Sequence, residues 1–324
     1  MTNFQVYKKT LPFSFLRFLI DLLALAILGG CTAAGLFIAG GQFDSKGIIG
    51  LIVGLIIGAI LTFLVSFFIE NRVKGAQISM MTQGVVEGNL PDHPVHEGLN
   101  NMKGRFSRLA TYYLITRAIK GIFRQLGNTV NKIGTAVGGN VGNGVTSAID
   151  SAVQTVISYL CDCCLGWILY RKDVNPFKAG CEGCIIFFKH GRALIKNIGR
   201  IFGLGLLSLI LIGGAFFGAS YAVFITFPNL TNALIEGFKN IAATDGGVPP
   251  EFFTNPTYVN LIMSGIIGIV FWGILHSVLI KPFVLVGVLR NYMNAGIANM
   301  PSEKEFAELA EKSPKFAQLQ SKIE

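Results

Sequence analysis

Residues 48–69 read IIGLIVGLIIGAILTFLVSFFI, an apolar run without a single charged side chain. An α-helix needs about 20 such residues to cross the hydrocarbon core of a bilayer. Three other stretches are comparably long and apolar, at residues 13–40, 201–227 and 258–280. The chain is therefore expected to be an all-α integral membrane protein with about four transmembrane helices.

The composition supports the same fold class. The 324 residues are 52% hydrophobic and only 14% charged, whereas a typical soluble domain carries about 25% charged residues. The net charge of +9 comes mainly from basic residues that flank the apolar runs. Membrane topology and anionic lipid account for such flanks better than nucleic acid does. We expect membrane lipids, anionic on the cytoplasmic side, as partners and no nucleic acid.

The loop charges predict the topology. Residues 41–46 carry no net charge, and residues 228–257 are net acidic. The opposite ends of the spans are basic, through Lys8, Lys9, Arg17, Arg72, Lys74, Lys189, Arg192, Lys196, Arg200, Lys281 and Arg290. The positive-inside rule then places both termini in the cytoplasm. The first apolar stretch exceeds the roughly 7–15 residues of a signal-peptide core, so we expect it to be retained as a span.

This reading divides the chain into four segments. Residues 1–70 form an N-terminal transmembrane hairpin, and residues 71–200 form a basic cytoplasmic or interfacial helical segment. Residues 201–295 form a C-terminal transmembrane pair, and residues 296–324 form a cytoplasmic tail. In the tail, one apolar stripe predicts an amphipathic helix, formed by Phe306, Leu309, Phe316 and Leu319.

The central segment contains three helical patterns. Residues 102–127 and 177–197 mix apolar and basic side chains at helical spacing, as in helices that lie among lipid headgroups. For residues 102–127, packing on the protein's own cytoplasmic face explains the pattern equally well. Residues 145–170 are apolar apart from Asp150 and Asp162, with basic residues on both sides. A half-inserted, re-entrant or cytoplasmic helix is therefore favoured there over a fifth span.

Glycines recur every four residues in the second span, at Gly50, Gly54 and Gly58. Small residues at this spacing remove side chains from one helix face and allow another helix to approach closely. The motif predicts a packing face. It leaves open whether the partner is the first helix or another subunit, so a homo-oligomer is one alternative.

Two ionisable residues fall within the spans and are candidates for a transport pathway, because charge is costly inside a membrane. Asp21 follows Arg17 by one turn, which also fits a simple ion pair between the two. His276 follows Trp272 by four residues. It could relay protons or line a polar cavity with Trp272, or it could bond to a neighbouring helix. Pro282, just beyond, predicts a kink.

The cysteines form two CxxC pairs, Cys161 with Cys164 and Cys181 with Cys184. This spacing can bind zinc, but both pairs fall in expected helices, which favours structural or lipid-facing thiols. A cytoplasmic location argues against disulfides. The chain has no GxSxG, GxxxxGK or HExxH motif. We therefore expect neither an enzyme nor a cofactor.

Three short motifs occur in a characteristic order: RVKGAQ at residues 72–77, CDCCLGW at 161–167 and VLRN at 288–291. In this order they resemble the C-terminal half of the choline transporter-like proteins. The likeness covers residues 48–295. This chain lacks the family's first half and its large outer loop. The resemblance implies transport of a small amine or a lipid-related solute, and it carries over no substrate residues.

Two functions follow as alternatives. A transporter-like protein should hold a polar cavity that contains Asp21 or His276. A non-transporting membrane scaffold, or a lipid-organising protein that uses basic amphipathic helices, should instead be a solid glycine-packed bundle without such a cavity.

Overall fold

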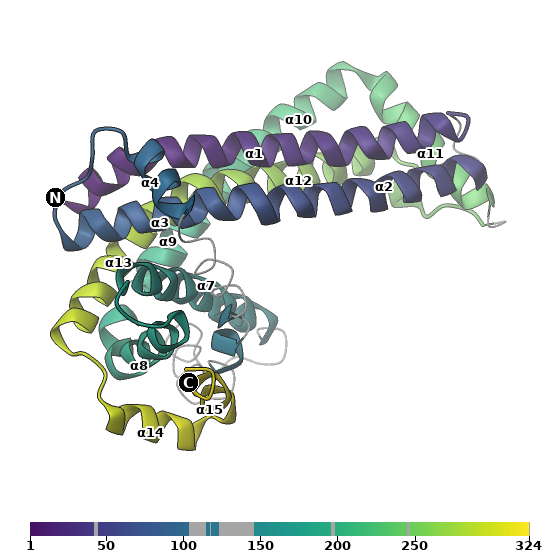
Figure 1. The fold of residues 1–324 in the computed structure, drawn as a ribbon. Coiled ribbons are helices and arrows are strands. Elements are labelled where there is room, and N and C mark those ends of the chain that lie inside the picture. The colour runs from purple at the N-terminus through teal and green to yellow at the C-terminus, as the bar shows by residue number, and fades with distance from the viewer. Residues whose placement is uncertain are drawn as a thin grey trace. The chain divides into compact units, whose positions relative to one another are not determined.

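The computed structural model describes residues 1–41, 45–103, 115–116, 118–122, 146–195, 198–244 and 247–323. Within these ranges the chain is helical and contains no strand (Figure 1). Four stretches are long and apolar enough to cross a membrane: Asn3–Ile38, Lys46–Val86, Ile201–Thr226 and Pro256–Ala298. The expected all-α membrane fold with four spans is confirmed.

The elements of the first half are α1 (Asn3–Ile38), α2 (Ser45–Val65), η1 (Ser66–Glu70), α3 (Asn71–Val86) and α4 (Pro94–Lys103). Those of the second half are α7 (Thr146–Tyr170), α8 (Pro176–Ile195), α9 (Ile198–Ser208), η2 (Leu209–Gly213), α10 (Gly214–Thr226), α11 (Pro228–Thr244), η3 (Glu251–Phe253), α12 (Pro256–Leu275), η4 (His276–Ile280), α13 (Lys281–Ala298), α14 (Glu303–Lys312) and α15 (Pro314–Gln320).

Three of the four spans contain a π-helical turn, namely η1, η2 and η4. A π-turn adds a residue to the helical turn and often marks a functional position. Two of the helices, α1 and α3, are followed by glycines that permit the chain to turn. After α1, Gly40 and Gly41 have φ of 112° and 72°, and after α3, Gly88 has φ of 73°. Glycine adopts this left-handed region without the steric cost that a β-carbon imposes.

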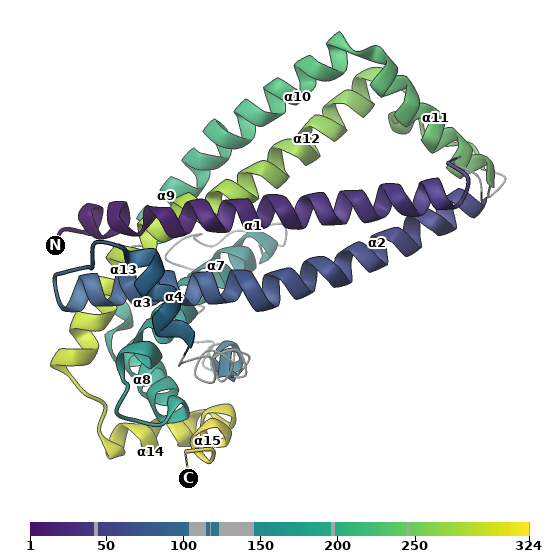
Figure 2. The same cartoon turned by 45° about the horizontal axis from the view of Figure 1, so that its top comes forward.

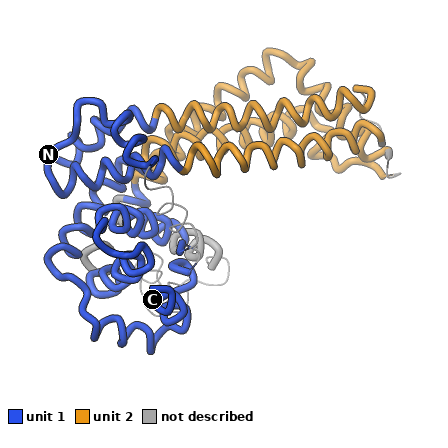
Figure 3. The backbone as a smooth tube through the Cα atoms, viewed as in Figure 1, with its two compact units in different colours: residues 1–14, 72–203, 281–324 blue, residues 15–71, 204–280 orange. Residues whose placement is uncertain are grey.

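The chain forms two compact units (Figure 3). Unit 1 contains residues 1–14, 72–203 and 281–324, and unit 2 contains residues 15–71 and 204–280. Each unit is assembled from segments far apart in the sequence. The predicted N-terminal hairpin and C-terminal pair both contribute to unit 2.

Unit 2 consists of two helical hairpins. In one, α2 lies beside α1, and in the other α10 lies beside α12, with α11 continuing from α10 (Figure 2). The glycine motif packs against α1. A β-carbon at Gly50 would overlap the Gly35 carbonyl, and one at Gly54 would overlap the Cys31 carbonyl. The partner of the predicted packing face is therefore the first helix of the same chain.

Unit 1 is built around α7, α8 and α13, which pack on one another. Its largest fully buried side chains include Trp167, Tyr159, Tyr292 and Phe187. The helix expected at residues 145–170 is α7, which is not among the four candidate spans. Its second half, from Val156 onward, is largely buried within protein.

The other amphipathic predictions have different outcomes. In α8 the stretch 179–187 is buried, so protein covers the face that we had expected among headgroups. The tail stripe is confirmed, because Phe306, Leu309, Phe316 and Leu319 are all buried. Most of the pattern at residues 102–127 lies outside the described residues. The outer loop, residues 228–257, contains a helix that we did not predict, α11.

Candidate functional site

A pocket of about 330 Å³ lies within unit 2, among α1, the end of α2 with η1, and the end of α12 with η4. Its polar lining comprises Asp21, Thr62, Ser66, Glu70 and Ser277. Its apolar lining comprises Ala24, Leu25, Leu28, Gly273 and Ile274. The predicted candidate Asp21 therefore lines a pocket of mixed polar and apolar side chains in the unit that contains the spans.

A buried arginine organises the polar side of this pocket. The Nη2 atom of Arg17 lies 3.5 Å from the Glu70 Oε1 atom, and it also donates to the Ser277 hydroxyl over 3.3 Å. The Arg17 side chain is only 5% exposed, whereas that of Glu70 is 23% exposed. The structure thus pairs Arg17 with Glu70, a partner that the sequence analysis did not suggest. This arginine joins α1 to both η1 and η4.

Two π-turns supply the residues that the sequence analysis did not select. Ser66 and Glu70 are the first and last residues of η1, and Ser277 is the second residue of η4. The one sequence signal for Glu70 was a carboxylate directly after the apolar run, which we read as the end of the N-terminal transmembrane hairpin. Nothing in the sequence indicated Ser277.

His276 and Trp272 form a separate polar cluster around Ser208. The Trp272 Nε1 donates to the Ser208 hydroxyl over 3.0 Å, and the His276 Nδ1 lies 3.2 Å from the same oxygen. That hydroxyl donates to the Gly205 carbonyl over 2.7 Å. His276 is thus bonded to a neighbouring helix, which was the second alternative for it. Neither His276 nor Trp272 lines the Asp21 pocket.

Unit 1 contains a buried ionic triad that the sequence analysis did not anticipate. One carboxylate oxygen of Asp162 lies 2.7 Å from Lys74 Nζ, and the other lies 2.9 Å from Lys281 Nζ. Lys281 also donates to the Ser158 hydroxyl over 2.8 Å and lies over the Tyr159 ring. Burial favours the neutral acid, but the two lysines outweigh it and lower the pKa of Asp162 to about 2.

The cysteine pairs lie in α7 and α8, and their thiols are free and buried. Burial raises the pKa of the Cys181 thiol to about 12 and that of Cys161 further. Zinc needs a thiolate, which such burial disfavours. Within the described part of the chain, no group of three or more His, Cys, Asp or Glu residues is placed to hold a metal.

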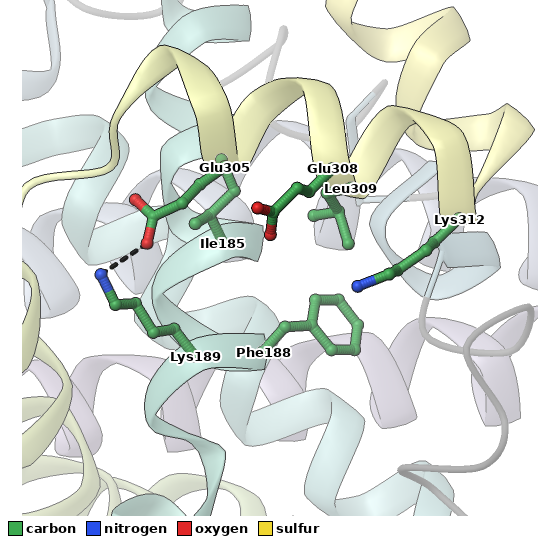
Figure 4. A pocket seen from close by; sticks show the side chains of 7 residues that line it. All are labelled: Ile185, Phe188, Lys189, Glu305, Glu308, Leu309 and Lys312. Carbon is green, nitrogen blue, oxygen red and sulfur yellow. Dashed lines mark ion pairs between the residues drawn. The ribbon is translucent and has the colours of Figure 1, made fainter.

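A second pocket, of about 220 Å³, lies in unit 1 between α8 and α14 (Figure 4). Lys189 and Glu305 form an ion pair of 2.5 Å at one side. The pocket is lined by Ile185, Phe188, Lys189, Glu305, Glu308, Leu309 and Lys312. Hydrogen bonds from Lys189 and the Ser302 backbone lower the pKa of Glu305. These contacts hold the tail helix on α8.

Comparison with known proteins found no matching family model, no matching curated protein and no matching solved structure. The candidate site therefore rests on the geometry of this chain alone.

Proposed function

We propose that this chain is a transporter-like membrane protein and that its solute, a small amine or another small cation, enters the pocket lined by Asp21 and Glu70. The observation that carries the proposal is the pocket itself, in which two carboxylates and three hydroxyl groups line one site among the expected spans. Ionisable groups at such positions are costly and are retained mainly for function.

The charge of the pocket favours a cation. Ionised Asp21 and Glu70 contribute two negative charges, and Arg17 contributes one positive charge. The cluster is then left with one net negative charge, which a monovalent cation would neutralise. The apolar side of the pocket suits the hydrocarbon part of an amine, as in most small-molecule sites. The resemblance to the choline transporter-like proteins points to the same class of solute.

We also propose a topology. Both termini and the basic segment of residues 71–200 face the cytoplasm, as the distribution of lysine and arginine predicts. Accessibility of cysteines introduced at Lys8 and at Val248 tests it. In intact cells, an impermeant thiol reagent should label position 248, which is 93% exposed, and should spare position 8. Labelling at position 8 in intact cells would show that the N-terminus faces outward and would contradict the proposed topology.

A membrane scaffold remains the second candidate, because the glycine contacts between α1 and α2 are as tight as a solid bundle requires. The two functions differ in the role of the pocket. For a scaffold, the charges of Asp21 and Glu70 serve stability alone, and solute uptake does not depend on them.

The test is uptake of labelled choline and related amines into liposomes that contain the purified protein. We expect saturable uptake that is lost in Asp21→Asn and in Glu70→Gln. Glu236→Gln serves as the matched control, because this exposed glutamate of α11 lies in the same unit but outside the pocket. His276→Ala should retain uptake, since its contacts are with Ser208. Folded, correctly oriented protein that takes up none of these amines would count against the proposal and favour the scaffold.

A further inference from the structure

A groove in unit 2 runs along the seam between α1 and α2 and has no part in the proposed transport. Its volume is about 380 Å³, which is within the range of small-molecule sites. The lining includes the glycines at which the two helices approach each other, Gly35, Gly50 and Gly54. Among the described residues, those that line the groove come from α1, from Ala39 directly after it and from α2. The groove therefore lies within a single hairpin.

The groove is open towards the surroundings of this hairpin. Its aliphatic walls include Ile38, which is 87% exposed, and Ile49, which is 62% exposed. In a membrane span, exposed aliphatic side chains face lipid tails, which are equally apolar. An empty hollow beside such side chains would cost the van der Waals contacts that they make when it is filled. We therefore expect lipid to occupy the groove.

The length of the groove fits one acyl chain. On α2 it extends from Lys46 to Ile57, and at 1.5 Å per residue this is about 16 Å. The hydrocarbon core of a bilayer is about 30 Å thick, so one leaflet contributes about 15 Å. Since the apolar run begins at residue 48, the groove extends from the headgroup level to near the middle of the bilayer.

Lys46 gives the groove a charged end. The other described side chains that line the groove are aliphatic, apart from the thiol of Cys31. Lys46 is exposed and precedes the apolar run by two residues. A lysine at the end of a span places its ammonium group at the membrane interface, where lipid phosphates lie. A lipid whose acyl chain fills the groove therefore brings a phosphate to a cation.

We propose that this groove binds one acyl chain of an anionic phospholipid, whose phosphate is held by the ammonium group of Lys46. The single positive charge favours a headgroup with a net negative charge over a zwitterionic one, whose own cation opposes the attraction. Small residues such as Ala34 leave the space that the chain occupies. The inference stands on contacts within the α1–α2 hairpin and does not depend on uptake through the Asp21 pocket.

Native mass spectrometry of the full-length protein in detergent measures the binding. Phosphatidylglycerol is the probe, and diacylglycerol with the same chains lacks the phosphate. Lys46→Gln removes the charge, and Ala34→Leu fills part of the groove. Lys239→Gln and Ala33→Leu are the matched controls, because both residues are exposed in the same unit but do not line the groove. The melting temperature of each variant shows whether it is folded.

Cys31 reports on the groove itself. It lines the groove and is partly exposed, whereas the other five cysteines are buried. Its labelling by a small maleimide should slow as phosphatidylglycerol is added. The concentration that gives half of this effect should equal the concentration that half-saturates the lipid adduct.

We expect one tightly bound phosphatidylglycerol per chain. Lys46→Gln and Ala34→Leu should each weaken its binding about fivefold or more, as expected from the loss of one lysine at a membrane surface and from overpacking. Lys239→Gln and Ala33→Leu should bind it as the parent does. Diacylglycerol should bind the parent and Lys46→Gln equally weakly.

Three results would overturn the inference. The first is equal affinity in all variants, or binding of diacylglycerol as tight as that of phosphatidylglycerol. The second is a lipid adduct that leaves the labelling of Cys31 unchanged, because the lipid would then lie elsewhere. The third is a dimer that binds no lipid and protects Cys31, because the groove would then be an interface between two copies of the chain.

Discussion

Gly54 of α2 faces the backbone carbonyl of Cys31 in α1, so closely that a β-carbon at position 54 would overlap the carbonyl oxygen. Gly35 and Gly50 make the same kind of approach further along the hairpin. The two helices therefore meet backbone to backbone, which is the arrangement that small residues permit in membranes.

Gly54→Ala should separate α1 from α2 and lower the free energy of unfolding by about 1–3 kcal/mol, the usual cost of overpacking. Thermal unfolding in detergent measures it. Gly218→Ala is the matched control, because a β-carbon there meets nothing within 4 Å. It should be neutral or slightly stabilising, since alanine favours the helix. Equal melting temperatures for the two variants would contradict the close packing.

Arg17→Met should destabilise unit 2, because Glu70 loses its ion pair and Ser277 loses a donor. Glu70→Gln in the same chain should restore part of the loss. A double-mutant cycle of unfolding free energies should give a coupling of about 0.5–3 kcal/mol, as for residues in one network. If the two substitutions have additive effects on the unfolding free energy, the 3.5 Å contact between Arg17 and Glu70 contributes nothing measurable to stability.

The depressed pKa of Asp162 predicts a defined pH dependence. The folded-state value is about 2 and the ordinary value is 3.8, so the folded protein holds the charged form more tightly. This stabilisation is complete above pH 3.8 and is lost as the pH falls towards 2. It should amount to about 2 kcal/mol. Between pH 5 and pH 2, the midpoint of denaturation should therefore fall further for the parent than for Asp162→Asn. An equal fall of the denaturation midpoint in the parent and in Asp162→Asn would contradict the lowered pKa of Asp162.

Phe316→Ala should release the C-terminal tail. The side chain is fully buried, and truncation of a buried phenylalanine costs about 3–5 kcal/mol. Limited proteolysis should then cleave residues 303–323 faster than in the parent. Gln318→Ala, at an exposed position of the same helix, is the control and should leave the rate unchanged. Slow cleavage of the Phe316 variant would show that α14 and its ion pair with Lys189 suffice to hold the tail.

The proposal that Asp21 serves transport depends on residues that the sequence did not single out. Asp21 was identified because a carboxylate in an apolar run is conspicuous. Glu70 directly follows such a run, and the sequence analysis treated it only as the last residue of the N-terminal hairpin. Ser277 carried no signal, since a single serine is common in membrane helices. His276 was as conspicuous as Asp21, yet its partners are Ser208 and Trp272.

The sequence by itself determined the four spans, the glycine face of α2 and the apolar stripe of the tail. Each of these depends on length or on local periodicity, which the bilayer and the helix impose on any chain. Only the tertiary structure decided which residues meet. Arg17 reaches Glu70 and Ser277 across 53 and 260 positions of sequence, and Asp162 draws Lys74 and Lys281 to one carboxylate. Such contacts arise from the packing of distant helices, whose register no local pattern encodes.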